Sequence, residues 1–443
     1  MKFWQILICC GCFWVQLVNA DELAKSPIDI SFAVEKYQLK NGLTVLLHKD
    51  DSVPLVSLQQ WYRVGSTHEE PGKTGLAHFF EHLMFKGTPR YPGETTQALI
   101  QKSGGSNNAF TTFDYTGYYV NFPPEKLQLF LDMESDRMVH LRFDQKEIDA
   151  EREVVKEEKR VRFDNSVYGS MFLAMVQTLF KVSDYRWPVI GSMRDLNAAS
   201  IEDFKSFYHR FYSPNNSVLV LAGSFDVDQA KKYIDQYYGK LEPKELNKHR
   251  PTQEPSQMSP RHVTLKKDVQ APSFSISAHA PHEGTKDSLV MDIIAKALGE
   301  GDSSRLHRRL VYKSKLATYA ISYHYPMARE GLVSIVASLS PGKSIAKAMT
   351  LVKDEIAKIR KSGLTDLELE KTKNIVMVDY VNGLKTISGK ARAIAETETV
   401  EGDYSLLFDK LNVYQSITKE DVIRVANQYL TPNKFSIIKV MPK

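Results

Sequence analysis

Cysteine is almost absent from the sequence and is confined to one end of it. The 443-residue chain contains three cysteines, Cys9, Cys10 and Cys12, all within the first 20 residues. The rest of the chain therefore has no side chain that could form a disulfide, bind a metal as a thiolate or act as a cysteine nucleophile. A cysteine-free body also suits an oxidising compartment, where free thiols are a liability.

An excess of charge of one sign is lacking as well. The formal net charge is +5, from 58 basic and 53 acidic residues, and no long block of lysine and arginine occurs. This balance argues against a nucleic-acid-binding protein. Hydrophobic residues make up 42% of the chain and charged residues 25%, as is typical of globular proteins. The length predicts roughly two to four domains.

A long apolar run lies at the N-terminus. Met1-Lys2 precedes the apolar residues 3–18, and Val18-Asn19-Ala20 ends the run before the polar Asp21. We interpret residues 1–20 as a signal peptide, which predicts export to the periplasm of a Gram-negative bacterium or secretion. The alternative is a retained membrane anchor, but the run is short for crossing a bilayer. A lipid anchor on Cys12 is a further, weaker alternative, because Cys9 is a poor residue three positions earlier.

Residues 241–262 have the composition of a linker, with prolines at 243, 251, 255 and 260 among polar residues. The segments on either side resemble each other. Tyr212-Ser-Pro-Asn and Leu430-Thr-Pro-Asn each precede an apolar strand-like run, and Pro214 and Pro432 are 218 residues apart. The same offset carries Pro54 onto Pro272. A single offset at both ends indicates an internal duplication, with residues 21–240 and 263–443 as two similar domains.

Each half combines strand-like and helical patterns without a regular alternation, so we expect an α+β fold of two similar α/β-sandwich-type domains. Asn41-Gly42 separates two short apolar segments and predicts a hairpin. Residues 109–122 alternate like one strand. Long helical patterns cover residues 95–102, 127–139, 145–162, 289–298 and 364–394.

The segment around residues 78–82 reads His78-Phe-Phe-Glu81-His82, the reverse of the His-Glu-x-x-His metallopeptidase motif. On a helix, His78 and His82 project from one face and can chelate one metal ion. Glu81 lies close to that face and can take a proton from an attacking water. The alternative interpretation is an ordinary amphipathic helix with three polar residues. A second motif of this type does not occur, and the corresponding residues of the second half are Lys296 to Glu300.

A catalytic zinc site needs a third protein ligand and an open position. An acidic helical pattern downstream contains Glu151, Glu153, Glu157 and Glu158. Glu151 and Glu158 are seven residues apart, about two helical turns, and so share a face. Glu158 could reach the ion and Glu151 could orient a ligand. Spacing alone does not choose Glu158 over Glu157 or Glu153, and the run is also typical of a plain charged helix.

The sequence resembles the pitrilysin/insulysin family of zinc peptidases over nearly its whole length, from about residue 33 to 440. Within the family it is most similar to the branch of mitochondrial processing peptidase and its bacterial relatives. The matching motifs are Val64-Gly-Ser, Gly75 to Thr88, Glu151-Arg-Glu-Val-Val and Tyr212-Ser-Pro-Asn-Asn.

The resemblance implies Zn²⁺ held by His78, His82 and Glu158, with Glu81 as the catalytic base and Glu151 as a supporting carboxylate. It also implies that Asn108 and Ala109 open an edge strand to which a peptide substrate adds. A one-residue shift would exchange Asn107 for Asn108, and the local pattern alone favours a plain turn and strand. The chain would then be one half of a clamshell-shaped peptidase.

Family members that act alone carry an Arg and a Tyr, seven residues apart, in the half without zinc. Here Asp302-Ser-Ser-Arg305 matches the lead-in to that element, but the two positions fall on Val311 and Thr318. Arg308, Arg309 and Tyr319 are nearby but out of register. The resemblance therefore predicts a heterodimer, in which a homologous chain without zinc supplies the Arg/Tyr pair.

These observations together predict a zinc-dependent endopeptidase that hydrolyses unfolded peptides. One alternative is a non-catalytic peptide-binding or structural subunit of the same family. Another is a metal hydrolase that acts on non-peptide substrates, which the duplicated halves make less attractive.

Overall fold

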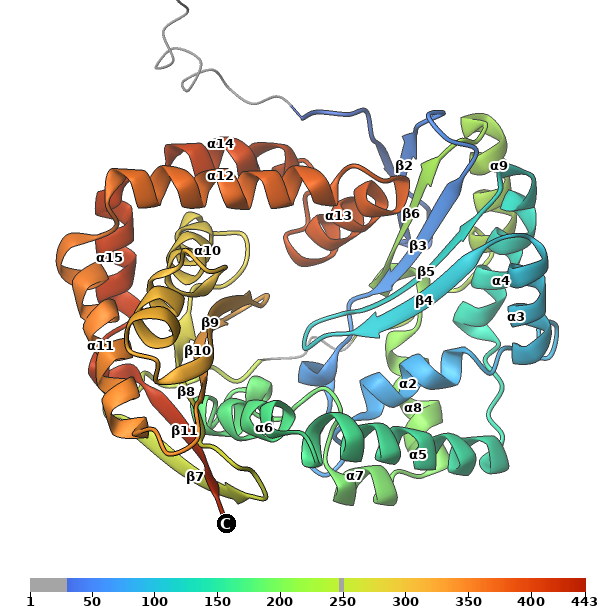
Figure 1. Ribbon diagram of the computed structural model, residues 1–443. Coiled ribbons are helices and arrows are strands. Elements are labelled where there is room, and N and C mark those ends of the chain that lie inside the picture. Colours follow the sequence, from blue (N-terminus) through green and yellow to red (C-terminus); the bar gives the residue numbers. More distant parts are fainter. Residues whose placement is uncertain (1–29, 247–250) are drawn as a thin grey trace, which may run out of the picture.

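The computed structural model describes residues 30–246 and 251–443 as two mixed β-sheets, each flanked by helices (Figure 1). The proposed signal peptide lies outside the described residues. Within these two ranges, no helix combines the length and apolar character required to cross a bilayer. The α+β class and the two-domain architecture expected from the sequence are confirmed.

The first half contains a six-stranded sheet with the order β1-β2-β6-β3-β5-β4. Its strands are β1 (Glu35–Gln38), β2 (Thr44–Lys49), β3 (Val56–Tyr62), β4 (Ser106–Thr111), β5 (Thr116–Phe122) and β6 (Ser217–Gly223). The hairpin predicted at Asn41-Gly42 is present as β1 and β2. The helices of this half are α2 (Leu76–Met84), α3 (Gly93–Lys102), α4 (Leu127–Val139), α5 (Gln145–Lys159), α6 (Val167–Leu179), α7 (Met193–Ala198), α8 (Ile201–Phe211) and α9 (Val227–Tyr238).

The second half contains a five-stranded sheet with the order β7-β11-β8-β10-β9. Its strands are β7 (Arg261–Lys267), β8 (Ser273–Ala280), β9 (Ala317–Pro326), β10 (Gly331–Leu339) and β11 (Ser436–Pro442). Its helices are α10 (Lys286–Gly299), α11 (Ile345–Ser362), α12 (Asp366–Gly383), α13 (Ile387–Val400), α14 (Leu406–Ser416) and α15 (Lys419–Tyr429).

The two sheets share one topology. The order β2-β6-β3-β5-β4 in the first half corresponds to β7-β11-β8-β10-β9 in the second. In each sheet the first strand pairs in parallel with the last strand of its half, and the remaining pairs are antiparallel. β1 is an addition to the first sheet. This match supports the internal duplication inferred from the 218-residue offset.

The halves exchange a helix with each other. The outer face of the first sheet, including Trp61 and Val220, is covered by α13, which belongs to the second half. The corresponding face of the second sheet, including Val336 and Ile438, is covered by α6 from the first half. Figure 1 shows α13 beside β6 and β3, and α6 beside β8 and β11. Because the first sheet is buried on both faces, its central strand β6 reads as an apolar run without alternation.

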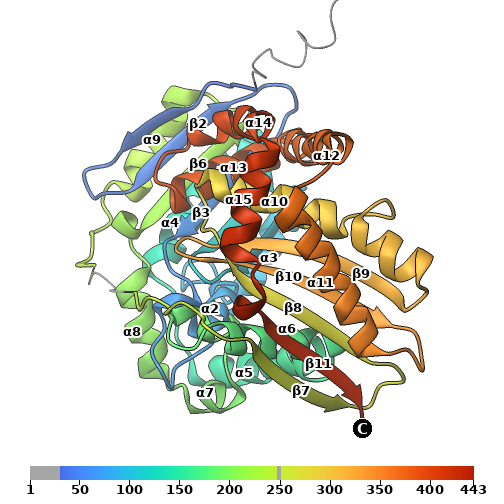
Figure 2. The same ribbon diagram turned by 90° about the vertical axis from the view of Figure 1, so that its left-hand side faces the viewer.

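Helices of its own half cover the other face of each sheet. In the first half, α2, α4, α8 and α9 pack on the sheet around the buried Phe80 and Phe204. In the second half, α10, α11, α12 and α15 pack on the sheet around Ile294 and Val352. The view in Figure 2 shows α15, α11 and α10 lying across the second sheet.

Two element predictions were wrong. Residues 109–122, predicted as one strand, form the antiparallel pair β4 and β5 around a turn at residues 112–115. The helix predicted over residues 364–394 breaks after Gly383, and α13 restarts with the Thr386 side chain accepting a hydrogen bond from the backbone N–H of Gly389. The break is required for α13 to leave its own half and reach the first sheet.

The described part of the linker is anchored on both halves. The Glu254 carboxylate accepts hydrogen bonds from the backbone N–H groups of Lys181, Val182 and Ser183. The Gln257 side chain is buried and donates to the backbone oxygen of Phe435. These bonds hold residues 251–260 against the chain instead of leaving them as a free tether.

The exchanged helices predict that the two halves unfold together. Ile394 of α13 is fully buried against the first sheet, so we expect Ile394→Ala to destabilise the protein by about 2–5 kcal/mol. Urea unfolding followed by the fluorescence of Trp61 and Trp187, both in the first half, should then shift in parallel with circular dichroism from the whole chain. Val378→Ala, which changes an exposed side chain of α12, is the control, with an expected change within about 0.5 kcal/mol. Non-coincident transitions would contradict this arrangement.

Candidate metal centre

Helix α2 carries the His-x-x-Glu-His motif and is fixed at its N-terminus by a buried acid. The helix begins after Gly75, which has a positive φ of 94° and supplies no capping side chain. Instead, the Glu69 carboxylate accepts hydrogen bonds from the backbone N–H groups of Gly75 and Ala77, both at 2.8 Å. Phe79, Phe80 and other apolar residues bury the opposite face. The helix is therefore positioned before any metal binds.

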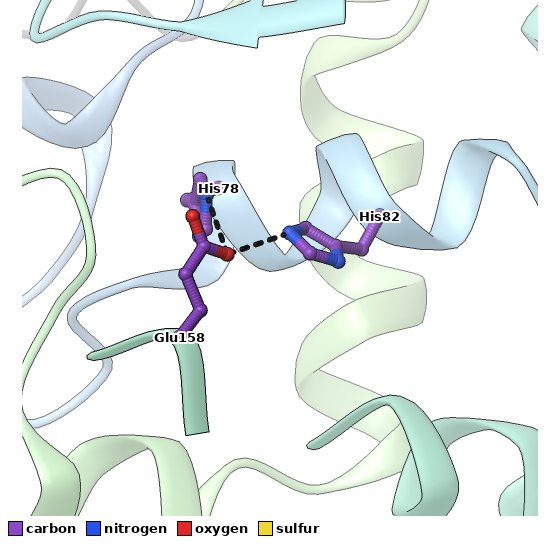
Figure 3. A group of neighbouring side chains, drawn as sticks. All are labelled: His78, His82 and Glu158. Carbon is purple, nitrogen blue, oxygen red and sulfur yellow. Dashed lines mark ion pairs between the residues drawn. The ribbon is translucent and has the colours of Figure 1, made fainter. Parts of the chain in front are cut away.

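The structure brings His78, His82 and Glu158 together, as the sequence predicted (Figure 3). Glu158 lies near the C-terminus of α5, which packs against α2. Its Oε2 atom lies 3.3 Å from Nε2 of His82 and 3.7 Å from Nε2 of His78. All three possible ligand atoms lie within 4.8 Å of one another.

These separations suit a small divalent cation. In a tetrahedral zinc site with bonds of about 2.0–2.1 Å, neighbouring ligand atoms are about 3.3 Å apart. The two distances from Glu158 to the histidines are close to that value. Two imidazole nitrogens and one carboxylate oxygen are also a ligand set of catalytic zinc sites, with a fourth position left for solvent or substrate.

Glu151 lies about two helical turns before Glu158 on α5 and supports the site. Its Oε1 atom lies 2.8 Å from Nδ1 of His82, and its Oε2 atom lies 2.5 Å from Nζ of Lys86. The hydrogen bond to Nδ1 directs Nε2 of His82 toward Glu158 and fixes the ring orientation. Glu151 therefore occupies the supporting position that the family resemblance implied, and Lys86 holds Glu151 in turn.

Glu81 is placed beside the cluster by the edge strand. The Thr111 hydroxyl, at the end of β4, donates a hydrogen bond of 2.6 Å to Oε2 of Glu81. The contact joins β4 to α2 and orients the carboxylate next to the two histidines. Sequence reasoning missed Thr111, because it is 30 residues away and only the pairing of β4 with β5 brings it to α2.

The electrostatics of the cluster favour a bound cation. Burial, together with the neighbouring His82, lowers the pKa of His78 to about 4, so this imidazole is neutral at pH 7. Burial also lowers the pKa of His82, but hydrogen bonds to Glu151 and Glu158 outweigh it and raise that pKa to about 9. In the metal-free protein, the two carboxylates thus hold a positive charge at the place where a metal ion would sit. Burial raises the pKa of the Glu81 carboxyl, which makes it a stronger base.

Arg162 lies at the solvent side of the cluster. Its guanidinium pairs with Oε1 of Glu158 at 2.6 Å, which leaves Oε2 directed to the histidines. Arg162 belongs to a π-helical turn, Arg160–Asp164, that continues α5. Such turns often occur at functional sites because they shift the register of the following side chains.

The structure resolves the choice among the acidic residues of α5. Glu158 and Glu151 face α2, whereas Glu153 and Glu157 are exposed and pair with Lys156 and Arg160 of their own helix. The packing of α5 against α2 therefore distinguishes Glu158 and Glu151 from the other two acids, a choice that sequence spacing alone did not make.

Asn108 and Ala109 lie on β4, which is the edge strand of the first sheet. Asn108 pairs with Tyr119 and Ala109 with Tyr118 across the hairpin. The Asn108 side chain accepts a hydrogen bond from the backbone N–H of Ala109 at 2.9 Å. An edge strand beside Glu81 has the position that peptide addition requires, and substrate binding by these two residues stays a prediction.

The second half carries an ammonium group at the corresponding place. Lys296 and Glu300 correspond to His78 and His82, and Asp379 occupies the same position along α12 as Glu158 along α5. Nζ of Lys296 forms ion pairs with Glu300 and, at 2.8 Å, with Asp379. A lysine cation therefore links α10 and α12 where a metal ion would link α2 and α5.

The residues considered for the Arg/Tyr pair lie on β9 and on the segment that precedes it. Arg308 and Arg309 belong to the π-helical segment His307–Lys313. Tyr319 is half-exposed on β9 and contacts Tyr168 of α6 edge-on. Arg305 pairs with Glu368 at 2.6 Å and so fixes the start of α12.

Comparisons with known proteins agree with this fold and site. The model of the insulinase family, peptidase family M16, matches residues 44–183, which include every residue of the cluster. The M16 inactive-domain model matches residues 198–376, which run from the last elements of the first half into the second half. A zinc protease from Helicobacter pylori, PqqE, is 30% identical over 92% of this chain and 93% of its own length. An uncharacterised zinc protease from Bacillus subtilis, YmxG, is 24% identical over 90% and 96%.

Solved structures show the same fold. A protease from Helicobacter pylori superposes with a TM-score of 0.89 and 28% identity, over 93% of this chain and 99% of that one. The periplasmic protease PqqL from Escherichia coli superposes with a TM-score of 0.75 and 19% identity, over 94% of this chain but 48% of that one. The duplicated fold of this chain is that of these proteases. The chain belongs to peptidase family M16, as its resemblance to the pitrilysin/insulysin family predicted.

The capping of α2 by Glu69 can be tested by stability. Glu69→Ala removes both acceptors from two buried N–H groups, so we expect a loss of about 1–3 kcal/mol in the free energy of unfolding. The neighbouring Glu70 is an exposed residue paired with Arg210, and Glu70→Ala should change stability by less than about 0.5 kcal/mol. Chemical denaturation of the two variants measures the difference. Equal effects would exclude a special role for Glu69.

Proposed function

We propose that this chain is a zinc-dependent endopeptidase that cleaves unfolded peptides. The observation that carries the proposal is the convergence of His78, His82 and Glu158, with the Glu81 carboxylate beside them. Membership of a peptidase family and the zinc protease names of relatives support it. Zinc held by these three residues would supply the Lewis acidity that polarises a peptide carbonyl and lowers the pKa of the attacking water.

The protein's own groups then handle the protons and the substrate. Glu81 removes the proton from the attacking water and delivers it to the leaving amine. Thr111 keeps the Glu81 carboxylate in place, and Glu151 fixes the His82 ring. A peptide paired along the β4 edge would lie extended next to Glu81, held by main-chain hydrogen bonds that tolerate many sequences.

The role of Glu81 is tested by Glu81→Gln. The amide keeps the size of the side chain but cannot accept the proton, so we expect peptide cleavage to fall by about 10²–10⁴-fold. Zinc content and thermal stability should stay unchanged, because Glu81 is not a proposed ligand. Peptidase assays of the protein with its partner, if it needs one, measure the loss. Normal turnover by this variant would refute the proposed role.

The ligand assignment is tested on adjacent residues. Glu158→Gln should strongly reduce zinc binding, because a neutral amide is a poor zinc ligand. Glu157→Gln is the matched control, since Glu157 is exposed and pairs only with Arg160 in the described structure. Zinc content after dialysis, measured by elemental analysis, should be near one equivalent for the control and well below that for Glu158→Gln. Equal zinc content in both variants would remove Glu158 from the site.

We also propose that the chain acts as the catalytic subunit of a heterodimer. The motif-derived Arg and Tyr positions are occupied by Val311 and Thr318, so a homologous chain without zinc would supply that pair. We expect the purified chain alone to cleave peptides weakly, and the complex purified under native conditions to cleave them strongly. Strong zinc-dependent cleavage by the isolated chain would contradict the need for a partner.

The apolar N-terminal run supports a periplasmic or secreted location for this activity. The alternative function is a non-catalytic peptide-binding or structural subunit. It would not need a complete ligand set, so zinc analysis of the purified chain separates the two proposals.

A further inference from the structure

A basic pocket lies on the outer helical layer of the second half, apart from the metal centre. It is a hollow of about 530 Å³. The segment before β9, the C-terminal end of α11, and the N-terminal ends of α12 and α15 border it. Figure 2 shows these helices on the side of the second sheet away from α6. Six basic and two acidic side chains line it: Arg305, Arg308, Arg309, Lys313, Lys358, Lys419, Glu355 and Glu368.

Both acids are already neutralised by partners within the pocket wall. Glu368 pairs with Arg305 at 2.6 Å and also accepts a hydrogen bond from the backbone N–H of Thr365. Glu355 pairs with Lys358 at 2.7 Å. In the described parts of the chain, no acidic side chain forms an ion pair with the other four cations, Arg308, Arg309, Lys313 and Lys419. The Nε atom of Arg309 is buried and has no hydrogen-bond partner among the described residues.

In the first half, arginines at the corresponding place are in ion pairs with acidic residues. Around α4, the helix that corresponds to α11, Arg90 pairs with Asp132 at 2.7 Å, and Arg137 pairs with Glu134. Four unpaired cations around one hollow are therefore not a general property of this duplicated fold. They repel one another, which favours an anion that neutralises them.

We propose that this pocket binds a phosphate-bearing anion with at least two negative charges. Guanidinium groups bind phosphate oxygens through paired, charge-assisted hydrogen bonds, and the hydroxyl groups of Ser362 and Thr365 line the same wall. The volume exceeds that of a single phosphate, so the ligand carries more than one phosphate group or an organic part. A soluble polyphosphate compound and the headgroup of an anionic phospholipid share this chemistry.

The test uses inorganic pyrophosphate and vesicles that contain cardiolipin, a lipid with two phosphate groups, with the full-length mature protein at about 150 mM salt, where weak surface attraction is largely screened. We expect saturable pyrophosphate binding by calorimetry. The variant Arg308→Gln/Arg309→Gln/Lys313→Gln should weaken it by at least about tenfold. The control Lys343→Gln/Lys347→Gln/Lys353→Gln removes the same charge from exposed positions outside the pocket, and its affinity should stay within about twofold.

The vesicle arm identifies the source of the phosphate. Vesicle binding that the triple variant loses and that pyrophosphate competes away assigns the pocket to a lipid headgroup. Pyrophosphate binding without vesicle binding assigns it to a soluble ligand. If the triple variant does not fold because it lacks Arg309, the double variant Arg308→Gln/Lys313→Gln takes its place. This variant changes only exposed side chains. The proposal is overturned if neither probe binds, or if the pocket and control variants lose affinity equally.

Discussion

One carboxylate oxygen on α5 has to meet two imidazole nitrogens on α2, and the rest of the structure makes this possible. The two helices belong to segments about 70 residues apart, so no local interaction fixes their distance. Glu69 holds the start of α2, Glu151 joins α5 to His82, and Thr111 joins α2 to the sheet edge. Each of these hydrogen bonds fixes the orientation of a polar side chain. Each also offsets the free-energy cost of burying that polar group. The side chains of the candidate metal centre are thereby preorganised.

The exchange of α6 and α13 explains why the two halves form one unit. Each sheet needs a helix on its second face, and that helix comes from the other half. α6 follows the π-helical turn after Glu158 by a few residues, so the second half also anchors the segment that ends the metal site. The second half, which lacks the His-x-x-Glu-His motif, therefore helps to fix the geometry of the candidate metal centre in the first half.

The two halves differ in how the carboxylates between two corresponding helices are neutralised. In the first half the candidate ligands on α2 and α5 would need a cation from solution, whereas in the second half the ammonium group of Lys296 is a cation that belongs to the chain itself. In both arrangements, a cation would offset the negative charge of carboxylates at the contact between two helices. Only the first leaves a coordination position that a substrate could use, which is the physical basis for expecting one catalytic centre.

The sequence by itself determined the class of fold, the duplication and the ligand pair on α2, because periodicity and the four-residue spacing are local properties of a helix. It also limited the third ligand to a short acidic run. Spacing alone did not choose Glu158 and Glu151 over Glu153 and Glu157. The family resemblance named the first two, and the tertiary structure gives the physical reason, because these two residues lie on the face of α5 that packs against α2. The hairpin that brings Thr111 to Glu81 and the helix break that sends α13 to the other sheet were likewise invisible in the pattern. Local hydrogen bonds of Thr112 and Thr386 form the turn and the helix start. Which helix or sheet each element then contacts is decided by long-range packing, for which residues close in sequence carry no signal.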